Sequence, residues 1–335
     1  MNPRRDAYER LGGAYDPRVL EPSPPVVTEG PWFADDPVSP EDRPLGRLPV
    51  VTPVTGGDTT WDELCRDDPD LSRWCTERWL GAWQPLPPLP ARDRLPATRC
   101  AWHALAEHVL SPARHAANGK IGLRFTRSGF GTPFFPGAAG DEQVRVEGTS
   151  LVVDLGETIR RAPITTVAAA AEFARCAAGA PSGARYEEGG VTGVFEPTTP
   201  FTPDAPLELD PGATQALGEW FGFAASVLEQ LRAEAEPADA AARVQLWPEH
   251  FDLSVDAGHE EAGARGTFGL SPGDGDHDEP YVYVTHWTDV PPDPFWNDAA
   301  FGGASLPFGD VVAADDQRAA ALEFLRTGRR LLRGH

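Results

Sequence analysis

Residues 244–287 read VQLWPEHFDLSVDAGHEEAGARGTFGLSPGDGDHDEPYVYVTHW, and they hold the clearest strand pattern in the chain. Three segments alternate with a period of two residues, which is typical of β-strands: 244–256, 267–271 and 281–287. Between them lie a Gly- and Glu-containing loop at 257–266 and the turn sequence SPGDG at 271–275. This order predicts a three-stranded antiparallel meander at the centre of the fold.

The two faces of this meander differ in character. One face is predicted to be buried, and its members are apolar: Phe251, Leu253, Val255, Phe268, Leu270, Val282 and Val284. The opposite face is predicted to carry Leu246, Pro248, His250, Asp252 and Ser254 from its first strand. Tyr281 and Tyr283 join this face from the third strand, around the space that Gly269 leaves. Pro248 cannot donate to a strand ladder, so we expect it at an edge, at a bulge or at the start of a strand.

The polar face is the predicted site. His250 and Asp252 lie two residues apart and are flanked by phenols, a grouping suited to proton transfer or ligand binding. The candidate catalytic residues are His250, Asp252 and Tyr283. The candidate ligand-binding residues are Trp247, His250, Asp252, Gly269, Tyr281, Tyr283 and Trp296. The alternative is that His250 hydrogen-bonds Asp252 or nearby backbone and only fixes the sheet.

Metal ligation is the weaker hypothesis, with His250, Glu249 and Asp274 as its candidates. The acids at 274, 276 and 278 resemble the opening of a calcium loop, but Glu279 and Thr285 stand where that loop needs Gly and Glu. We therefore expect an exposed acidic turn. His103 and Glu107 have the four-residue spacing of helical metal ligands, yet such pairs are also common on helix surfaces. No P-loop, dinucleotide fingerprint, kinase motifs, serine-triad motif or zinc knuckle is present, so no cofactor is indicated.

The motifs WPEHFD at 247–252, FGLSPGD at 268–274 and EPYVYV at 279–284 resemble an uncharacterised bacterial family of unknown function. Members of that family show a helix, strands, a second helix, and then strands with similar Trp-Phe-Asp, Ser-Pro-Gly-Asp and Tyr-x-Tyr motifs. The similarity runs from about Thr98 to Asp310, with the specific motifs in the second half. The resemblance implies an architecture and no particular activity.

Composition excludes several classes of function. Of 335 residues 41% are hydrophobic, which supports a real core, and the net charge is −22. This acidity argues against binding to nucleic acid and to anionic membrane surfaces.

No run approaches the roughly 20 apolar residues of a membrane helix, and MNPRRDAYERLGG lacks the apolar region of a signal peptide. The four cysteines form no Cys-x-x-Cys pair, so we expect a cytoplasmic protein with reduced thiols.

The chain divides into an arm and one domain. Residues 1–58 are rich in Pro, Gly and acids and predict an extended arm. Residues 59–335 predict a single α+β domain, with a first half at about 59–178, a connecting loop at 179–209 and a second half at about 210–335. Helices are expected over two short stretches in 59–83 and at 98–118, 164–178, 210–234 and 315–332. Strands are expected in the first half at 121–126, 143–147 and 150–155.

The order of helix, strands and helix occurs twice. It predicts two antiparallel sheets, or one shared sheet, built from two α-βββ-α halves with helices packed on the sheet faces. Residues 291–308, PPDPFWNDAAFGGASLPF, are expected either to fold over the site as a lid or to plug the core.

Three functions are therefore open. The first is a polar-aromatic small-molecule pocket around His250. The second is a metal-dependent or acid/base enzyme that uses His250 and Asp252. The third is a non-catalytic interaction module, with self-association through the arm or through residues 291–308, which both carry apolar side chains.

Overall fold

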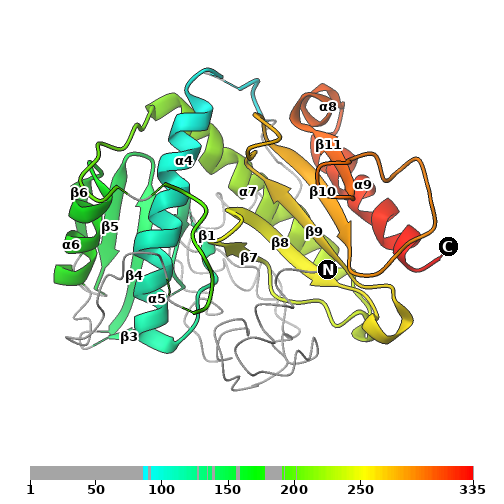
Figure 1. Ribbon diagram of the computed structural model, residues 1–335, viewed down its shortest axis with the longest axis horizontal. Helices are drawn as coiled ribbons and strands as arrows, with labels where there is room; N and C mark the ends of the chain where they lie inside the picture. Colours follow the sequence, from blue (N-terminus) through cyan, green and yellow to red (C-terminus); the bar gives the residue numbers. More distant parts are fainter. Residues whose placement is uncertain are drawn as a thin grey trace, which may run out of the picture.

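The fold is α+β and is shown by a computed structural model (Figure 1). The structure describes residues 86–89, 92–126, 128–133, 135–137, 140–155, 159–177, 191, 193–200 and 202–334. The predicted arm over 1–58 and the two helices predicted within 59–83 lie outside the described residues. Within the described part, no helix has both the length and the apolar character needed to cross a membrane.

The first sheet is antiparallel and six-stranded, in the order β1-β2-β4-β5-β6 with β3 paired to β4. Its strands are β1 (Arg124–Thr126), β2 (Gly129–Gly131), β3 (Phe135–Gly137), β4 (Gly140–Glu147), β5 (Ser150–Asp154) and β6 (Ile159–Pro163). Residues 128–133 lie outside the strands expected from the sequence, yet their glycines form β2. A Cβ atom at Gly129 would lie 2.1 Å from the carbonyl oxygen of Val146, so this strand pairing requires the missing side chain.

The second sheet is antiparallel and five-stranded, in the order β11-β10-β9-β8-β7. Its strands are β7 (Gln245–Trp247), β8 (Asp252–Ala257), β9 (Gly266–Ser271), β10 (Tyr281–His286) and β11 (Ala304–Pro307). One isolated bridge joins it to the first sheet, with N···O distances of 2.7 and 2.9 Å between the backbones of Leu123 and Leu246. The predicted class of two antiparallel sheets is confirmed, with six and five strands in place of three in each half.

The first helical run is continuous from Leu95 to Asn118. It consists of α4 (Leu95–Leu105), the π-helical turn η3 (Ala106–Leu110) and α5 (Ser111–Asn118), and it ends at Gly119 in the left-handed conformation (φ 74°). The helix begins before the expected start at residue 98, because Pro96 already lies in its first turn. The Thr98 hydroxyl accepts a hydrogen bond from the backbone N–H of Asp210 at 3.0 Å.

Helix α7 (Pro211–Ala233) organises the core. The helix expected at 210–234 is confirmed, and Asp210 caps it: its Oδ1 accepts a hydrogen bond from the N–H of Ala213 at 2.9 Å. Trp220 and Phe221 are fully buried, and the helix packs on β1 and β2 of the first sheet and on β8 and β9 of the second (Figure 1). The two sheets therefore share one hydrophobic cluster.

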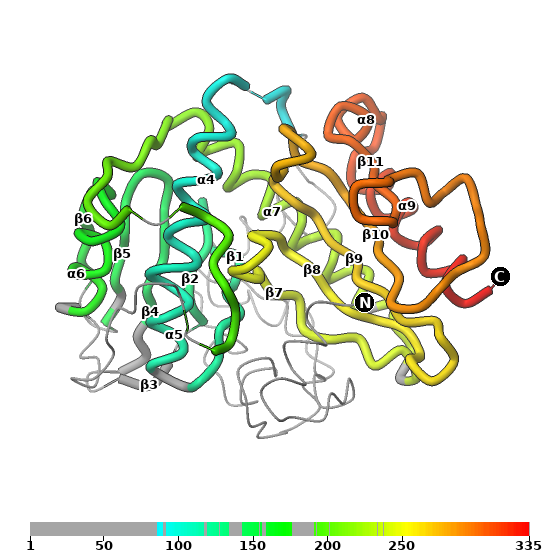
Figure 2. The backbone as a smooth tube through the Cα atoms, viewed as in Figure 1, coloured from blue at the N-terminus to red at the C-terminus, as the bar shows by residue number. Residues whose placement is uncertain are grey.

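The remaining helices are shorter or lie at the periphery. They are α6 (Val167–Ala177), α8 (Phe308–Ala313), α9 (Gln317–Leu332) and the 3₁₀ turns η4 (Pro237–Asp239) and η5 (Glu260–Ala262). Asp316 caps α9 through the N–H of Ala319, and Glu234 at the end of α7 pairs with Arg326 and Arg329 of α9. In the tube view the chain after β10 runs beside α9 before it enters β11 (Figure 2).

The predicted meander exists, with two corrections. All seven apolar residues expected inside it are buried. However, residues 244–256 are not one strand, because the chain turns at Pro248 between β7 and β8, and the turn closes with the N–H of Phe251 donating to Trp247 O at 2.7 Å. Leu246, expected on the polar face, is therefore buried opposite Leu253. The end of the 291–308 segment forms β11.

Candidate functional site

A cavity of about 850 Å³ lies between α4, the 198–200 segment and the second sheet. Its wall combines residues of α4, the 198–200 segment, the turn at 248–251, the outer faces of β8 to β10 and the loops at 273–277 and 300–302. Ligand pockets commonly have volumes between about 300 and 1,000 Å³ and mix apolar walls with a few polar groups.

The cavity brings together most of the predicted site residues. Those that line it are Glu249, His250, Asp252, Asp274, Tyr281 and Tyr283. His250 does not share a strand face with Asp252, because it belongs to the turn that Pro248 starts; its side chain is exposed.

Three predicted ligand-binding residues do not line the cavity. Trp247 is buried in the hydrophobic cluster at the end of β7. Gly269 faces the ring of Tyr283, and a Cβ atom there would lie 2.4 Å from two of its carbons, so this ring already occupies the space that the glycine leaves. Trp296 packs edge-to-face on His286 and on Phe295.

Asp252 and Tyr283 form a buried pair in the cavity wall. They come from β8 and β10, which both flank β9, and the Tyr283 hydroxyl donates a hydrogen bond to Asp252 Oδ2. Only 3% of Asp252 and 8% of Tyr283 are exposed, so the pair is a fixed part of the wall.

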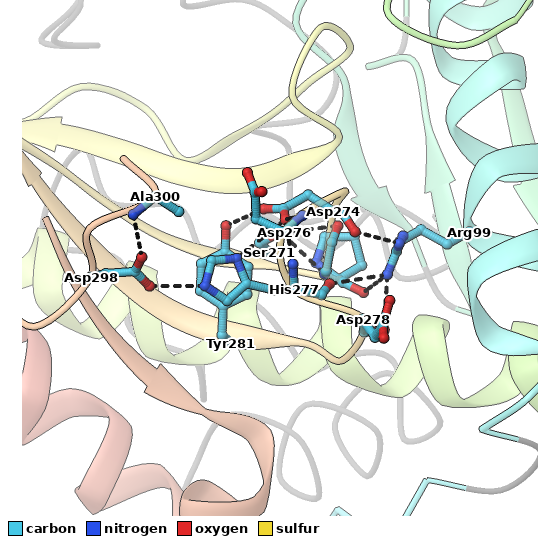
Figure 3. Close-up of polar contacts among 11 residues, drawn as sticks. Arg99, Ser271, Asp274, Asp276, His277, Asp278, Tyr281, Asp298 and Ala300 are labelled. Carbon is cyan, nitrogen blue, oxygen red and sulfur yellow. Dashed lines mark hydrogen bonds and ion pairs between the residues drawn. The ribbon is translucent and has the colours of Figure 1, made fainter. Parts of the chain in front are cut away.

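Asp274 lies at the centre of a second polar group, in the Ser-Pro-Gly-Asp turn (Figure 3). Its Oδ1 accepts hydrogen bonds from the backbone N–H groups of Asp276 and His277, both at 2.8 Å. Its Oδ2 accepts a hydrogen bond from the Tyr281 hydroxyl at 2.6 Å. Burial acts to raise the pKa of Asp274, but these hydrogen bonds outweigh it and hold the pKa below its usual value.

His277 bridges two carboxylates. Its Nδ1 lies 3.2 Å from Asp274 Oδ1, and its Nε2 lies 2.9 Å from Asp298 Oδ2 (Figure 3). Burial opposes protonation, but the hydrogen bonds and charges of the two carboxylates prevail and raise the pKa of His277. With both ring nitrogens engaged, His277 offers no lone pair to a substrate. Its role here is to hold the two loops together.

Arg99 of α4 fastens the turn from the opposite side. Its guanidinium donates to the carbonyl oxygen of Asp274 at 2.7 Å and to that of Asp278 at 3.0 Å (Figure 3). Burial lowers the pKa of Arg99, although the charges of Asp274 and Asp278 oppose this shift. A guanidinium that donates to several backbone carbonyls in this way holds the loop in position.

Glu107 holds a third group of contacts beneath the cavity. It is fully buried in the π-helical turn, and it accepts hydrogen bonds from the backbone N–H groups of Thr198 at 2.7 Å and Thr199 at 3.0 Å. His103, one turn earlier, lines the cavity with its Nε2 2.7 Å from the carbonyl oxygen of Pro248, and its ring stacks on Phe251. Burial acts to raise the pKa of Glu107, but hydrogen bonds from His103 and Thr199 lower it below its usual value.

Aromatic rings form the remaining wall. The ring centroids of Tyr281 and Tyr283 lie 6.2 and 6.0 Å from that of Phe301, whose loop reaches over β10. Trp287 also lines the cavity, and the guanidinium of Arg265 lies 5.0 Å from its ring centroid.

Sequence reasoning missed Arg99, His103 as a wall residue, His277 and Phe301. Arg99, His103 and Glu107 recur at four-residue intervals, so their shared helix face was a usable signal. Asp298 lies 21 residues after His277, and no local pattern connects them.

No metal centre stands out. In the part of the chain that the structure describes, no group of three or more His, Cys, Asp or Glu side chains is arranged to hold a metal ion. Glu249, His250 and Asp274 thus line one cavity without forming such a group.

Comparison of the chain with protein-family models, with curated proteins and with solved structures finds no match. The functional argument therefore depends on the geometry of the cavity.

Proposed function

We propose that this protein binds a small organic molecule in the cavity between its two halves. The observation that supports the proposal best is the cavity itself: about 850 Å³, with aromatic walls and fixed carboxylates from the second half and with Arg99 and His103 from the first. The fixed groups are held by hydrogen bonds within the protein, which favours a site that is formed before the ligand arrives. The contribution of both halves also supports the predicted single domain.

A blocked variant tests this proposal. Ala300 is exposed and lines the cavity, so Ala300→Trp should obstruct part of the cavity without disturbing the core. Ala299→Trp places the same side chain on the neighbouring exposed residue, which does not line the cavity. In a thermal-shift screen of small molecules, compounds that stabilise the wild type and Ala299→Trp should fail to stabilise Ala300→Trp. Equal stabilisation of all three proteins by every hit would overturn the proposal.

Acid/base catalysis is a second candidate function, favoured by the Asp252–Tyr283 pair in the cavity wall. The pair replaces the predicted His250–Asp252 pair, because His250 lies on a turn. A phenol that donates to a carboxylate can take part in proton transfer to a bound molecule. Once a ligand is known, its conversion can be followed by mass spectrometry in the wild type and in Tyr283→Phe. Conversion that persists in Tyr283→Phe would exclude this pair as the catalyst.

The other functional hypotheses remain predictions: self-association through the arm or through residues 291–308, a lack of nucleic-acid and membrane partners, and a cytoplasmic location. Cys100 is a free cysteine that is exposed at the cavity, and a free thiol suits a reducing compartment.

A further inference from the structure

We infer that the ligand of this cavity is an organic cation: a molecule with an apolar or aromatic body and an ammonium or guanidinium group. This inference rests on the proposed function and names the chemical class of its ligand. Three features of the cavity wall carry it.

The first feature is the direction of the hydrogen bonds. Several donors of the wall donate to acceptors of the protein. Tyr281 and Tyr283 donate to Asp274 and Asp252, and the Arg99 guanidinium donates to backbone carbonyls. The backbone N–H groups of Thr198 and Thr199 donate to Glu107. An anionic ligand needs donors that face it, and these groups face the protein instead.

The second feature is the charge of the wall. Five carboxylates line the cavity: Glu249, Asp252, Asp274, Asp276 and Asp289. The basic residues among the described lining residues are Arg99 and the histidines His103, His250, His277 and His286. Arg99 and His277 both contact the turn around Asp274. Asp276 and Asp289 are exposed, and they lie on separate loops of the wall. Carboxylates in a partly dry cleft attract a cation more strongly than they do in open solvent.

The third feature is the aromatic wall. Tyr281, Tyr283 and Phe301 form a continuous group of rings beside these carboxylates. The faces of such rings attract cations as well as apolar groups. The same chain already places a cation against a ring of the cavity, since Arg265 lies over Trp287. A neutral polyol would donate hydrogen bonds to the carboxylates, but its affinity would gain nothing from their negative charge.

The test uses three probes with one shape and three charges: phenethylamine, 2-phenylethanol and phenylacetate. Isothermal titration calorimetry of the full chain should show that phenethylamine binds about tenfold more tightly than 2-phenylethanol, and that phenylacetate binds most weakly. Binding of phenethylamine should weaken as salt is added, because salt screens the carboxylates.

Variants test whether the carboxylates of the cavity cause the preference for a cation. Asp276→Asn combined with Asp289→Asn should weaken binding of phenethylamine about threefold to tenfold and leave that of 2-phenylethanol unchanged. Asp204→Asn removes an exposed carboxylate outside the cavity and serves as the control. It should leave both affinities unchanged.

Two outcomes would overturn the inference: 2-phenylethanol or phenylacetate binding as tightly as phenethylamine, or no binding of phenethylamine at millimolar concentration. Neither outcome decides the proposed function. The proposed function holds if other compounds stabilise the wild type but do not stabilise Ala300→Trp. It is overturned if no compound shows this difference.

Discussion

His277 Nε2 lies 2.9 Å from Asp298 Oδ2, and this contact joins the turn after β9 to the loop before β11. The other ring nitrogen faces Asp274 at 3.2 Å, so one imidazole serves two carboxylates. Tyr281 also donates to Asp274, so His277 connects Tyr281, Asp274 and Asp298 in one group of contacts in the wall.

The first prediction concerns pH. Asp274 and Asp298 raise the folded-state pKa of His277 above its unfolded value of about 6.5. The stabilisation is therefore complete below about pH 6.5 and is lost as pH rises through the raised folded pKa. In urea unfolding, the free energy of unfolding of the wild type should fall across this pH range. The fall should be smaller in His277→Gln.

His259 provides the control for this prediction. It is exposed, and its Nδ1 accepts a hydrogen bond from the N–H of Ala262 rather than facing a carboxylate. The fall in stability above about pH 6.5 should therefore persist in His259→Gln. A wild-type slope in this window that persists in His277→Gln would contradict the assignment.

The second prediction concerns Gly273. Its φ is 99°, and a Cβ atom there would lie 2.3 Å from Arg99 Nη1. Gly273→Ala should therefore destabilise the protein by on the order of 1–3 kcal/mol, from backbone strain and displacement of Arg99. Gly275, two residues later, has open space around its Cβ position, and Gly275→Ala should change stability by less than about 0.5 kcal/mol. Equal effects of the two substitutions in denaturant melts would refute the role of Arg99 in shaping the turn.

The third prediction concerns Glu107. Its carboxylate is fully buried and accepts hydrogen bonds from the backbone of Thr198 and Thr199, so Glu107→Gln should lose about 1.5–3 kcal/mol of stability. Its pKa is lowered on folding, so this contribution is present at neutral pH and is lost as pH falls through the folded pKa.

Glu172 is a matched control for Glu107, since its ion pair with Arg175 is exposed. Glu172→Gln should cost less than about 1 kcal/mol. If calorimetric melts of Glu107→Gln match those of Glu172→Gln, the 198–200 segment is held by other contacts.

The fourth prediction separates binding from stability. Phe301 lines the cavity, whereas Phe295 of the same 291–308 segment packs on Phe324 of α9, with ring centroids 4.9 Å apart. Phe301→Ala should weaken ligand binding about fivefold to thirtyfold, because it removes an aromatic face. Phe295→Ala should lower the melting temperature and leave ligand affinity nearly unchanged. The reverse pattern would place the ligand elsewhere.

The sequence predicted the class of the fold because its strongest patterns are local. Alternation places Leu253, Phe268 and Val282 in the core, and Asp210 before Pro211 marks the start of α7. The prediction from alternation failed at Pro248. The alternation of apolar and polar residues continues through this position in the sequence, but the chain turns there. Phe251 takes a φ of 53° there, and its ring is buried against Phe130 and Phe221. Tertiary packing of one ring thus overrides the strand pattern.

The candidate site was predictable only in part. Asp252, Tyr281 and Tyr283 share a sheet face, so period-two spacing was enough to group them. Asp298 reaches His277 from a separate loop, and nothing in the spacing of either residue indicates that contact. The space predicted at Gly269 is filled by Tyr283, because a ring from the neighbouring strand packs across a position that has no Cβ atom.

The most direct test of the cavity as a ligand site is the NMR signal of the Trp287 indole, assigned with Trp287→Phe. Trp287 lines the cavity, while Trp102 is fully buried and donates its indole N–H to Gly148. Titration with phenethylamine, or with a compound from the thermal-shift screen, should move the Trp287 signal and leave that of Trp102 in place. The shift should be absent in Ala300→Trp. A ligand that binds with no change at Trp287, or that shifts Trp287 equally in Ala300→Trp, would contradict a binding site in this cavity.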